Sequence, residues 1–479
     1  MSADNLHNLE LKRRFHQMYG EGGASILRAP ARINILGEHV DYVSYLPTAS
    51  LPFGSHEHAM TMIFRPTMNG TVRGASTNES FAPFEFSLNE IQPPSRAEKN
   101  WEEFVFNRPL PAPHWSNYVK GAASFAQWKF GATINNGFDY LVDSTIPANS
   151  GASSSSALVV LAGAAIRQVN QTQFQLAELA QDSSQAEWFL GTRGGSLDHT
   201  AICLAKRHHT IHLSYADNRA ETIPLPSERF RWVTFFTHAA DKGREVMLEY
   251  NERAAVSRLI IPALIQKWET QNPHWFIDWR YAVALLRDGV LKTPDTLKAL
   301  IEQLPETLSL DDLSSINPRA FRDCEAAFPV LVAERRAHTL KIRARALHHL
   351  GEVWRVKQAV CVLRASQPEE DLMRQLGELI SQTHASLRDL YDVSTPQVER
   401  LLELLRIDSQ VFGARLMGGG FGGNVLALTT AEHASTLVDR IQQEFYTPQN
   451  RDSMSEGAVM ISTPGDGLSQ TAFSLSSND

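Results

Sequence analysis

The small residues from Gly151 to Ser156 have the types and the setting of an anion-binding loop. A strand is predicted before them, over 138–146, and a strongly apolar helix after them, over 155–169. The first turn of such a helix leaves N–H groups unpaired at the positive end of its dipole, and small residues let a phosphate approach. Serine hydroxyls can add hydrogen bonds and one Mg²⁺ ligand. A flexible serine-rich linker is the alternative, and the flanking strand and helix argue against it.

Charged residues stand close together in a second segment, Arg28 to Tyr42. A strand is predicted over 33–36, running into a turn at Gly37. This strand and turn carry Arg32, Glu38, His39 and Asp41. The plainest explanation is a polar turn with a salt-bridged arginine. A metal pair formed by the histidine and the aspartate would have too few ligands.

Two further segments add carboxylates and glycines. Glu187 precedes Asp198 by eleven residues, and Gly194-Gly195 lies just before the aspartate. The simple alternative to a functional role is that Asp198 lies in an ordinary turn. The run 418–423 contains a formal GxGxxG, but the residues after it, 425–429, are predicted to form a strand. A dinucleotide-binding fold would place a helix there. The sequence also lacks GxxxxGK[ST], which excludes a Walker-type phosphate loop.

Taken together, these segments resemble the signature motifs of the galactokinase branch of the GHMP small-molecule kinases. Arg32 to Tyr42 follows R-x-N-x-x-G-E-H-x-D-Y, the serine segment from Pro147 to Ser155 resembles P-x-G-x-G-L-S-S-S, and 186–199 resembles A-E-x…G-x-x-x-G-x-M-D-Q. Shorter matches surround Trp115 (W-x-N-Y-V-K-G) and Tyr250 (E-Y-N-x-R). The resemblance spans roughly residues 25–465, and 255–325 match poorly. The departures from the family pattern include Asn149 for Gly, Val43-Ser44-Tyr45 for Asn-Gly-Gly, His199 for Gln, Ala254 for a second Arg after the Tyr250 match, and Asn424 for Cys.

The resemblance implies a mixed α/β (α+β) fold with two lobes. It places a lobe like ribosomal protein S5 domain 2 at 20–225, and a ferredoxin-like lobe with extra helices at 226–465. The pattern along the chain agrees with this, because strands and helices alternate in the first half, whereas long helices precede a β-α-β pattern in the second. A helix is also predicted near the N-terminus, over 5–19.

The resemblance also assigns roles. It implies catalysis by Asp198, which would accept the proton of an anomeric hydroxyl, and by Arg32, which would stabilise the transferred phosphoryl group. Mg²⁺ would be held by Ser155 and Glu187. Hydroxyl groups of a sugar each need a partner when buried, and the residues implied for this are Glu38, His39, Asp41 and Tyr250. The residues implied for ATP are Gly151, Ser153, Ser154, Ser155, Trp115, Gly419 and Gly420.

The composition of the chain argues against several other classes of protein. The chain has 479 residues, 43% of them hydrophobic, and a net charge of −8, so it lacks the basic character of a nucleic-acid-binding protein. It has three cysteines without metal-binding spacing, an N-terminus without a signal-like apolar segment, and no run long enough to span a membrane. We expect a cytoplasmic protein, monomeric or weakly dimeric, that uses ATP, Mg²⁺ and a small sugar.

Three alternatives stay open. The first is a non-catalytic sensor of galactose and ATP on the same fold, which Asn149 and His199 favour and the intact acidic and arginine positions oppose. The second is a kinase for N-acetylgalactosamine, galacturonate or L-arabinose, since these sugars share the hydroxyl geometry that the first motif reads. The third is a kinase of a non-sugar such as mevalonate or homoserine, which the Gly-Glu-His-x-Asp-Tyr sequence disfavours.

Overall fold

The computed structural model describes residues 3–106, 108–147, 151–191, 194–239, 244–271, 279–291, 293–452 and 457–472. The chain divides into two units that are both discontinuous in sequence. Unit 1 comprises 1–33, 53–209 and 462–479, and unit 2 comprises 34–52 and 210–461. The division expected from sequence, 20–225 and 226–465, is continuous and so differs from these units.

Unit 1 is built on a mixed sheet with the strand order β16-β1-β3-β6-β4-β5, and β15 also pairs with β3. β4 and β6 run parallel, whereas β1 and β16 pair antiparallel through Ser25↔Ala472 to Arg28↔Ser469. The strands are β1 (Ser25–Asn34), β3 (Pro52–Thr67), β4 (Thr71–Ser76), β5 (Phe84–Ser87), β6 (Gly137–Ser144), β15 (Pro464–Gly465) and β16 (Ser469–Ala472).

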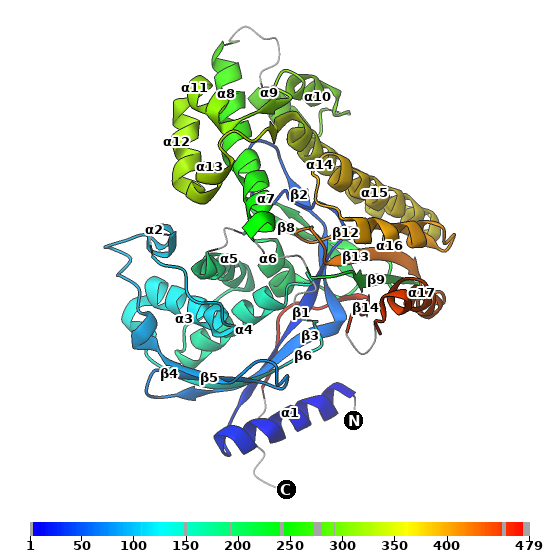
Figure 1. Cartoon of the computed structure of the whole chain (residues 1–479). Coiled ribbons are helices and arrows are strands. Elements are labelled where there is room, and N and C mark those ends of the chain that lie inside the picture. The colour runs from blue at the N-terminus through cyan, green and yellow to red at the C-terminus, as the bar shows by residue number, and fades with distance from the viewer. Residues whose placement is uncertain are drawn as a thin grey trace. The chain divides into compact units, whose positions relative to one another are not determined.

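Helices lie on both faces of this sheet (Figure 1). The N-terminal helix packs Leu11 and Phe15 against strand residues that include Ile26, Ile63 and Leu141. The group on the other face includes the apolar helix predicted from sequence, which runs from Ser154 to Val169. The helices of unit 1 are α1 (Ala3–Tyr19), α2 (Trp101–Phe106), α3 (Ser116–Phe130), α4 (Ser154–Val169), α5 (Leu176–Glu187) and α6 (Leu197–Leu204).

Unit 2 contains an antiparallel sheet with the order β12-β13-β9-β14, and a smaller one with the order β2-β7-β8. The larger sheet buries Val233, Leu416 and Val425 together with apolar residues of the helices α15, α16 and α17. The strands are β2 (Ala49–Ser50), β7 (His209–Ser214), β8 (Arg219–Pro224), β9 (Phe230–Phe236), β12 (Val411–Met417), β13 (Asn424–Thr430) and β14 (Val459–Ser462). A short pair, β10 (Thr307–Leu308) and β11 (Leu340–Lys341), lies among the helices.

A helical cluster forms the second core of unit 2, in the region that resembled the family least. Its buried residues come from 256–353 and also from the loop Val43–Leu46, which follows the first polar motif. The helices of unit 2 are α7 (Arg244–Ala255), α8 (Ile261–Gln271), α9 (Trp279–Arg287), α10 (Asp295–Ile301), α11 (Leu310–Ile316), α12 (Pro318–Ala327), α13 (Pro329–Arg335), α14 (Ile342–Arg364), α15 (Glu369–Asp389), α16 (Pro396–Arg406) and α17 (Ala434–Ile441). A π-helical turn, Val256–Ile260, joins α7 to α8.

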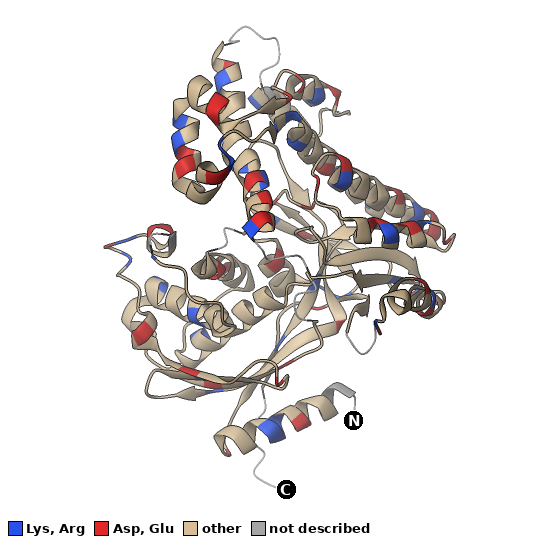
Figure 2. Cartoon of the chain, viewed as in Figure 1, with Lys and Arg blue, Asp and Glu red and all other residues tan. Residues whose placement is uncertain are grey.

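The predicted mixed class of helices and strands is confirmed, and so are the N-terminal helix and the strand after the glycine run. Basic and acidic residues occur side by side on the same helices, for example along α14 and α15 (Figure 2). Among the described residues, no helix has both the length and the apolar character needed to cross a lipid bilayer.

Candidate active site

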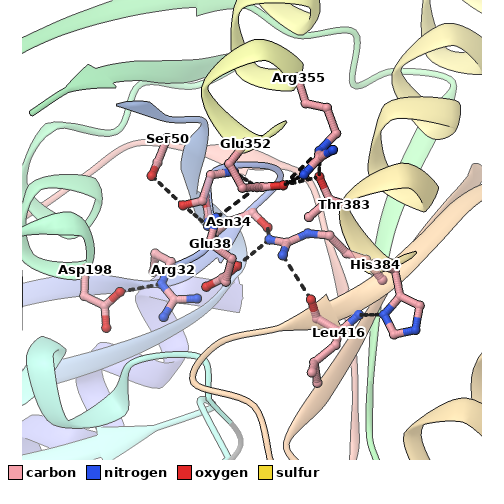
Figure 3. A network of polar contacts seen from close by, with 12 residues as sticks. Arg32, Asn34, Glu38, Ser50, Asp198, Glu352, Arg355, Thr383, His384 and Leu416 are labelled. Atoms are coloured by element: carbon pink, nitrogen blue, oxygen red, sulfur yellow. Dashed lines mark hydrogen bonds and ion pairs between the residues drawn. The ribbon is translucent and has the colours of Figure 1, made fainter. Parts of the chain in front are cut away.

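Asp198, Arg32 and Ser153 meet in unit 1. Asp198 lies in the first turn of α6, Arg32 near the end of β1, and Ser153 at the residue before α4. Arg32 Nε donates to Asp198 Oδ1 at 2.7 Å, and Ser153 Oγ donates to Asp198 Oδ2 at 2.6 Å. Figure 3 shows the arginine and the aspartate side by side. Both carboxylate oxygens are therefore held by donors.

The ionisation of Asp198 follows from these contacts. Burial alone would raise the pKa of this carboxyl, but the guanidinium of Arg32 and the two hydrogen bonds lower it more. The net result is a pKa below the ordinary value for aspartate. The side chain of Asp198 is 27% exposed, whereas that of Arg32 is only 6% exposed, so the carboxylate can still be reached by a ligand.

The serine loop has the geometry that the sequence suggested for an anion site. Gly151 and Ser153 both have positive φ, at 75° and 63°, and helix α4 starts directly afterwards. The main-chain N–H of Arg32 donates to the carbonyl of Ala152 at 3.3 Å, which ties the loop to β1. Ser154 and Ser155 are partly exposed at the first turn of a helix that is otherwise buried. Asn149, where the family has Gly, lies outside the described residues.

Glu187 lies at the end of α5 and contacts two groups through one carboxylate oxygen. Ser156 Oγ donates to Glu187 Oε2 at 2.9 Å, and His199 Nε2 lies 2.8 Å from the same oxygen. No group of three or more His, Cys, Asp or Glu residues suited to a metal is found in the described parts of the chain. Mg²⁺ bound with a nucleotide needs only one or two protein ligands, because phosphates and waters complete its shell. A single carboxylate near a serine-lined helix start fits that requirement.

Glu38 is buried in unit 2, after the chain leaves β1. Arg415 Nη2 donates to Glu38 Oε2 at 2.6 Å, and Asn34 Nδ2 donates to the same oxygen at 2.9 Å. Arg415 Nη2 also donates to the carbonyl of Asn34 at 2.5 Å. The side chains of Glu38 and Arg415 are 5% and 0% exposed. The glutamate predicted to select a sugar is thus also the centre of a buried ion pair.

The turn that carries Glu38 is held by Glu352, a residue that the sequence analysis missed. Glu352 Oε2 accepts from the main-chain N–H groups of Gly37 (2.9 Å) and Glu38 (3.2 Å), as part of the network in Figure 3. Its other oxygen accepts from Arg355 and Thr383. Burial would raise the pKa of Glu352, but Arg355 outweighs it and the pKa is lowered. Nothing in the local sequence of α14 marks this residue, because its partners are 315 and 314 positions away.

The buried pair leads to a first prediction. Replacing Arg415 by Met leaves the Glu38 carboxylate without its buried cation, and such a loss costs about 3–5 kcal/mol of unfolding free energy. Urea denaturation would measure it. The matched control is Arg374→Met on α15, whose pair with Glu370 is about half exposed and should contribute no more than roughly 1 kcal/mol. Equal losses in the two variants would show that the Arg415 pair does not stabilise unit 2.

His39 adopts a left-handed backbone conformation (φ 57°) and is buried. Its ring lies 4.7 Å from that of Tyr391 and 6.4 Å from that of Tyr250, centroid to centroid. Burial lowers the pKa of His39 to about 3, with a smaller contribution from Arg253, so the imidazole is neutral. Asp41 is partly buried, and Tyr250, on α7, is 39% exposed. The structure thus brings His39 and Tyr250 together.

Gly419 and Gly420 in the glycine run, and Trp115, are the other residues predicted to bind ATP. Gly420 has φ 83°, and a Cβ there would lie 2.5 Å from Val393 Cβ, so this position requires glycine. A Cβ on Gly419 would come no closer than 4.0 Å to the ring of Tyr250. In unit 1, Trp115 Nε1 donates to the carbonyl of Ala82 at 2.9 Å. The centroid of the Trp115 ring lies 4.7 Å from that of Phe84. Trp115 is partly exposed, and its aromatic neighbours include Phe81, Phe84 and Tyr140.

Three models of known protein families match parts of the chain. Residues 117–206 match the GHMP kinases N terminal domain, 369–447 match the GHMP kinases C terminal domain, and 13–49 match the galactokinase galactose-binding signature. The chain is 27% identical over 445 residues to a galactokinase of Roseiflexus sp. (strain RS-1), covering 92% of this chain and 93% of that one. It is 26% identical to a galactokinase of Bos taurus, covering 91% of each.

Solved structures share the fold. Lactococcus lactis galactokinase complexed with galactose matches with a TM-score of 0.68 at 23% identity, covering 97% of this chain and 99% of that one. Methanococcus jannaschii mevalonate kinase matches with a TM-score of 0.52 at 13% identity, covering 95% and 100%. At these identities the likeness establishes the fold, which is the two-domain kinase fold that the sequence motifs predicted.

Proposed function

We propose that this chain, which belongs to the GHMP kinases and carries a galactokinase galactose-binding signature, is an ATP-dependent sugar 1-kinase. It would transfer the γ-phosphoryl group of ATP to the anomeric C1 hydroxyl of galactose or a galactose-like sugar, giving a sugar 1-phosphate and ADP. The observation that carries this proposal is the ionised Asp198 held by Arg32 and Ser153 at the start of α4.

In this mechanism Asp198 orients the attacking hydroxyl and accepts its proton. The lowered pKa of Asp198 keeps it in the basic form at neutral pH. Arg32, fixed by its bond to Asp198, would stabilise the charge that develops on the transferred group. The N–H groups at the start of α4 would bind the nucleotide phosphates, together with Gly151, Ser153, Ser154 and Ser155.

Mg²⁺ would supply charge neutralisation on the phosphates. Ser155 and Glu187 would hold it, with the orientation of Glu187 fixed by Ser156 and His199. Trp115, Gly419 and Gly420 are assigned to the ATP site by the family resemblance alone. Glu38, His39, Asp41 and Tyr250 would bind the sugar hydroxyls, and the buried position of Glu38 and His39 suits recognition by paired polar groups.

The proposal also includes a cellular compartment, an oligomeric state and a class of partners. We place the enzyme in the cytoplasm as a monomer or weak dimer with small-molecule partners only. The cysteines Cys203, Cys324 and Cys361 are all free, which fits a reducing compartment.

ADP release with Mg-ATP tests the proposal, using galactose, N-acetylgalactosamine, galacturonate and L-arabinose in parallel. We expect turnover with galactose or one of its relatives. Sugar binding by calorimetry without ADP release would replace the kinase with the sensor. Turnover with mevalonate or homoserine, and not with any sugar, would contradict the sugar specificity.

A further inference from the structure

A continuous series of polar side chains joins Tyr45 to His39 in unit 2, and all of them are buried except the partly exposed Tyr42. Tyr45 Oη lies 2.6 Å from His349 Nδ1, and His349 Nε2 lies 3.4 Å from Ser257 Oγ. Ser257 Oγ lies 3.3 Å from Tyr391 Oη, and Tyr391 Oη lies 2.8 Å from Tyr42 Oη. The last step, from Tyr42 Oη to His39 Nδ1, is 3.1 Å. We call this series the hydroxyl–imidazole relay.

The relay is assembled from segments far apart in sequence. Tyr45 belongs to the three residues that stand where the family has Asn-Gly-Gly, and its main-chain carbonyl accepts from Trp279 Nε1 at 2.9 Å. His349 lies on α14 and Ser257 in the π-helical turn. The loop Val43–Leu46 is therefore packed into the helical core.

The rings in the middle of the relay are fixed. The Tyr391 ring is fully buried between two imidazoles, at 4.7 Å from His39 and 4.5 Å from His348, centroid to centroid. His348 is itself held by Ser386 Oγ at 2.9 Å and by the carbonyl of Glu38 at 3.3 Å. Rings packed this way keep the hydroxyl groups directed along the relay.

The direction of the hydrogen bonds can be deduced by counting protons. Each of the three tyrosines and Ser257 has one O–H to donate, and a buried donor without an acceptor is unfavourable. Among the described residues, Tyr45 Oη has His349 Nδ1 as its partner. If His349 donated from Nδ1, the Tyr45 O–H would have no acceptor there. Tyr45 must therefore donate to His349.

The same rule then fixes every later step. His349, accepting at Nδ1, carries its proton on Nε2 and donates to Ser257, which donates to Tyr391, which donates to Tyr42. Tyr42 is left to donate to His39 Nδ1. A neutral imidazole that accepts at Nδ1 carries its proton on Nε2. Burial lowers the pKa of both His39 and His349, so both rings are in the neutral form that this counting assumes.

We propose that Tyr42, supplied by the hydroxyl–imidazole relay, fixes His39 as the Nε2–H tautomer and makes it a hydrogen-bond donor to the sugar. His39 Nε2 is buried and has no hydrogen-bond partner within the described structure, so it is the nitrogen left for a ligand. Tyr42 is then a positioning residue, because it acts through His39. That the ligand is a sugar rests on the proposed function, whereas the tautomer of His39 follows from the hydrogen bonds of the relay.

The tautomer restricts the substrate class. The sugar position that faces His39 must offer a lone pair, so a hydroxyl or carboxylate oxygen is accepted there and a protonated amine is rejected. With the opposite tautomer the site would accept a hydrogen bond and would tolerate the amine.

Nitrogen-15 spectroscopy of histidine side chains tests the tautomer directly, in the full-length protein without any ligand. The chain has 17 histidines, and the His39 signals are assigned as those lost in His39→Gln. We expect the wild type to show a protonated Nε2 and an unprotonated Nδ1. A His39 protonated at Nδ1, or an even mixture of tautomers, would overturn the proposal, and this result needs no variant of the relay.

Two tyrosine-to-phenylalanine variants then separate positioning from packing. Tyr42→Phe removes the donor to His39, so the tautomers should mix, and the dissociation constant for the sugar should rise roughly 5- to 30-fold while that for ATP changes less than about twofold. Tyr446→Phe removes a buried hydroxyl of unit 2 that lies outside the relay and donates to the carbonyl of Phe236 at 2.9 Å, so the His39 signals should stay as in the wild type. Identical spectra and sugar affinities in Tyr42→Phe and the wild type would contradict the role of Tyr42. Failure of the proposed function would instead appear as no ADP release with an intact Nε2–H signal.

Discussion

Replacing Asp198 by Asn should lower the rate of ADP formation by about 10²- to 10⁴-fold while ATP still binds. The asparagine can keep the hydrogen bonds that Asp198 forms with Arg32 and Ser153, because it has both an acceptor and a donor. It cannot accept the proton of the sugar hydroxyl. The measurement is single-turnover ADP formation with the best sugar, combined with the dissociation constant for ATP.

A matched variant distinguishes loss of the base from loss of a buried carboxylate. Asp182, on α5 of the same unit, is also buried and pairs with Lys129 and Arg167. Asp182→Asn should lower the stability and leave the turnover of folded protein unchanged within about twofold. Retained turnover in Asp198→Asn would show that the proton is accepted elsewhere, and the kinase assignment of this residue would then be wrong.

Lowering the pH should destabilise the folded protein, and this should begin at pH values well above the pKa of its carboxylates. Four buried histidines have lowered pKa values, chiefly through burial: His39 (about 3), His384 (about 4), His348 and His349. Because the folded state binds fewer protons at these sites than the unfolded state, stability is complete above pH 6.5 and declines as pH falls from there toward the folded pKa values. At pH 5.5 each histidine costs on the order of 1 kcal/mol, so the four together cost several kcal/mol.

Urea unfolding at pH 7.5 and 5.5 would measure this loss, with the histidine content varied as a control. His384→Gln removes one of the four groups, so its loss of stability between the two pH values should be smaller than in the wild type by on the order of 1 kcal/mol. His338→Gln changes an exposed histidine and should leave the pH dependence as it is. A stability that is flat between these pH values would mean that the four histidines are protonated in the folded protein.

The parts of the site that the sequence predicted are those in which a local motif determines the geometry. The serine run was assigned to a helix start because small residues preceded an apolar segment, and α4 does begin there. Arg32, Ser153 and Asp198 were assigned to one site through the family resemblance, and the structure brings these side chains into contact. Their catalytic roles, and that of Glu187, stay predictions.

What could not be predicted depends on long-range packing. Glu352 follows a glycine in an ordinary helical sequence, yet its carboxylate holds the turn at Gly37. Tyr45 stands where the family pattern has Asn-Gly-Gly, and the structure packs it against Trp279 and His349, which are 234 and 304 positions away. Neither contact leaves a periodic or local signal, because the partner's identity is set by tertiary structure alone.

The pairing of β1 with β16 also bears on synthesis. At about 5–20 residues per second, the partner strand at 469–472 leaves the ribosome roughly 20–90 s after residues 25–28 have been made. During that interval Ser25–Arg28 lies at an unprotected sheet edge, the kind of surface that pairs with other chains. A premature stop just before Ser469 would therefore leave a protein that contains every proposed catalytic residue and is still prone to aggregate, because β16 covers this edge only when synthesis is nearly finished.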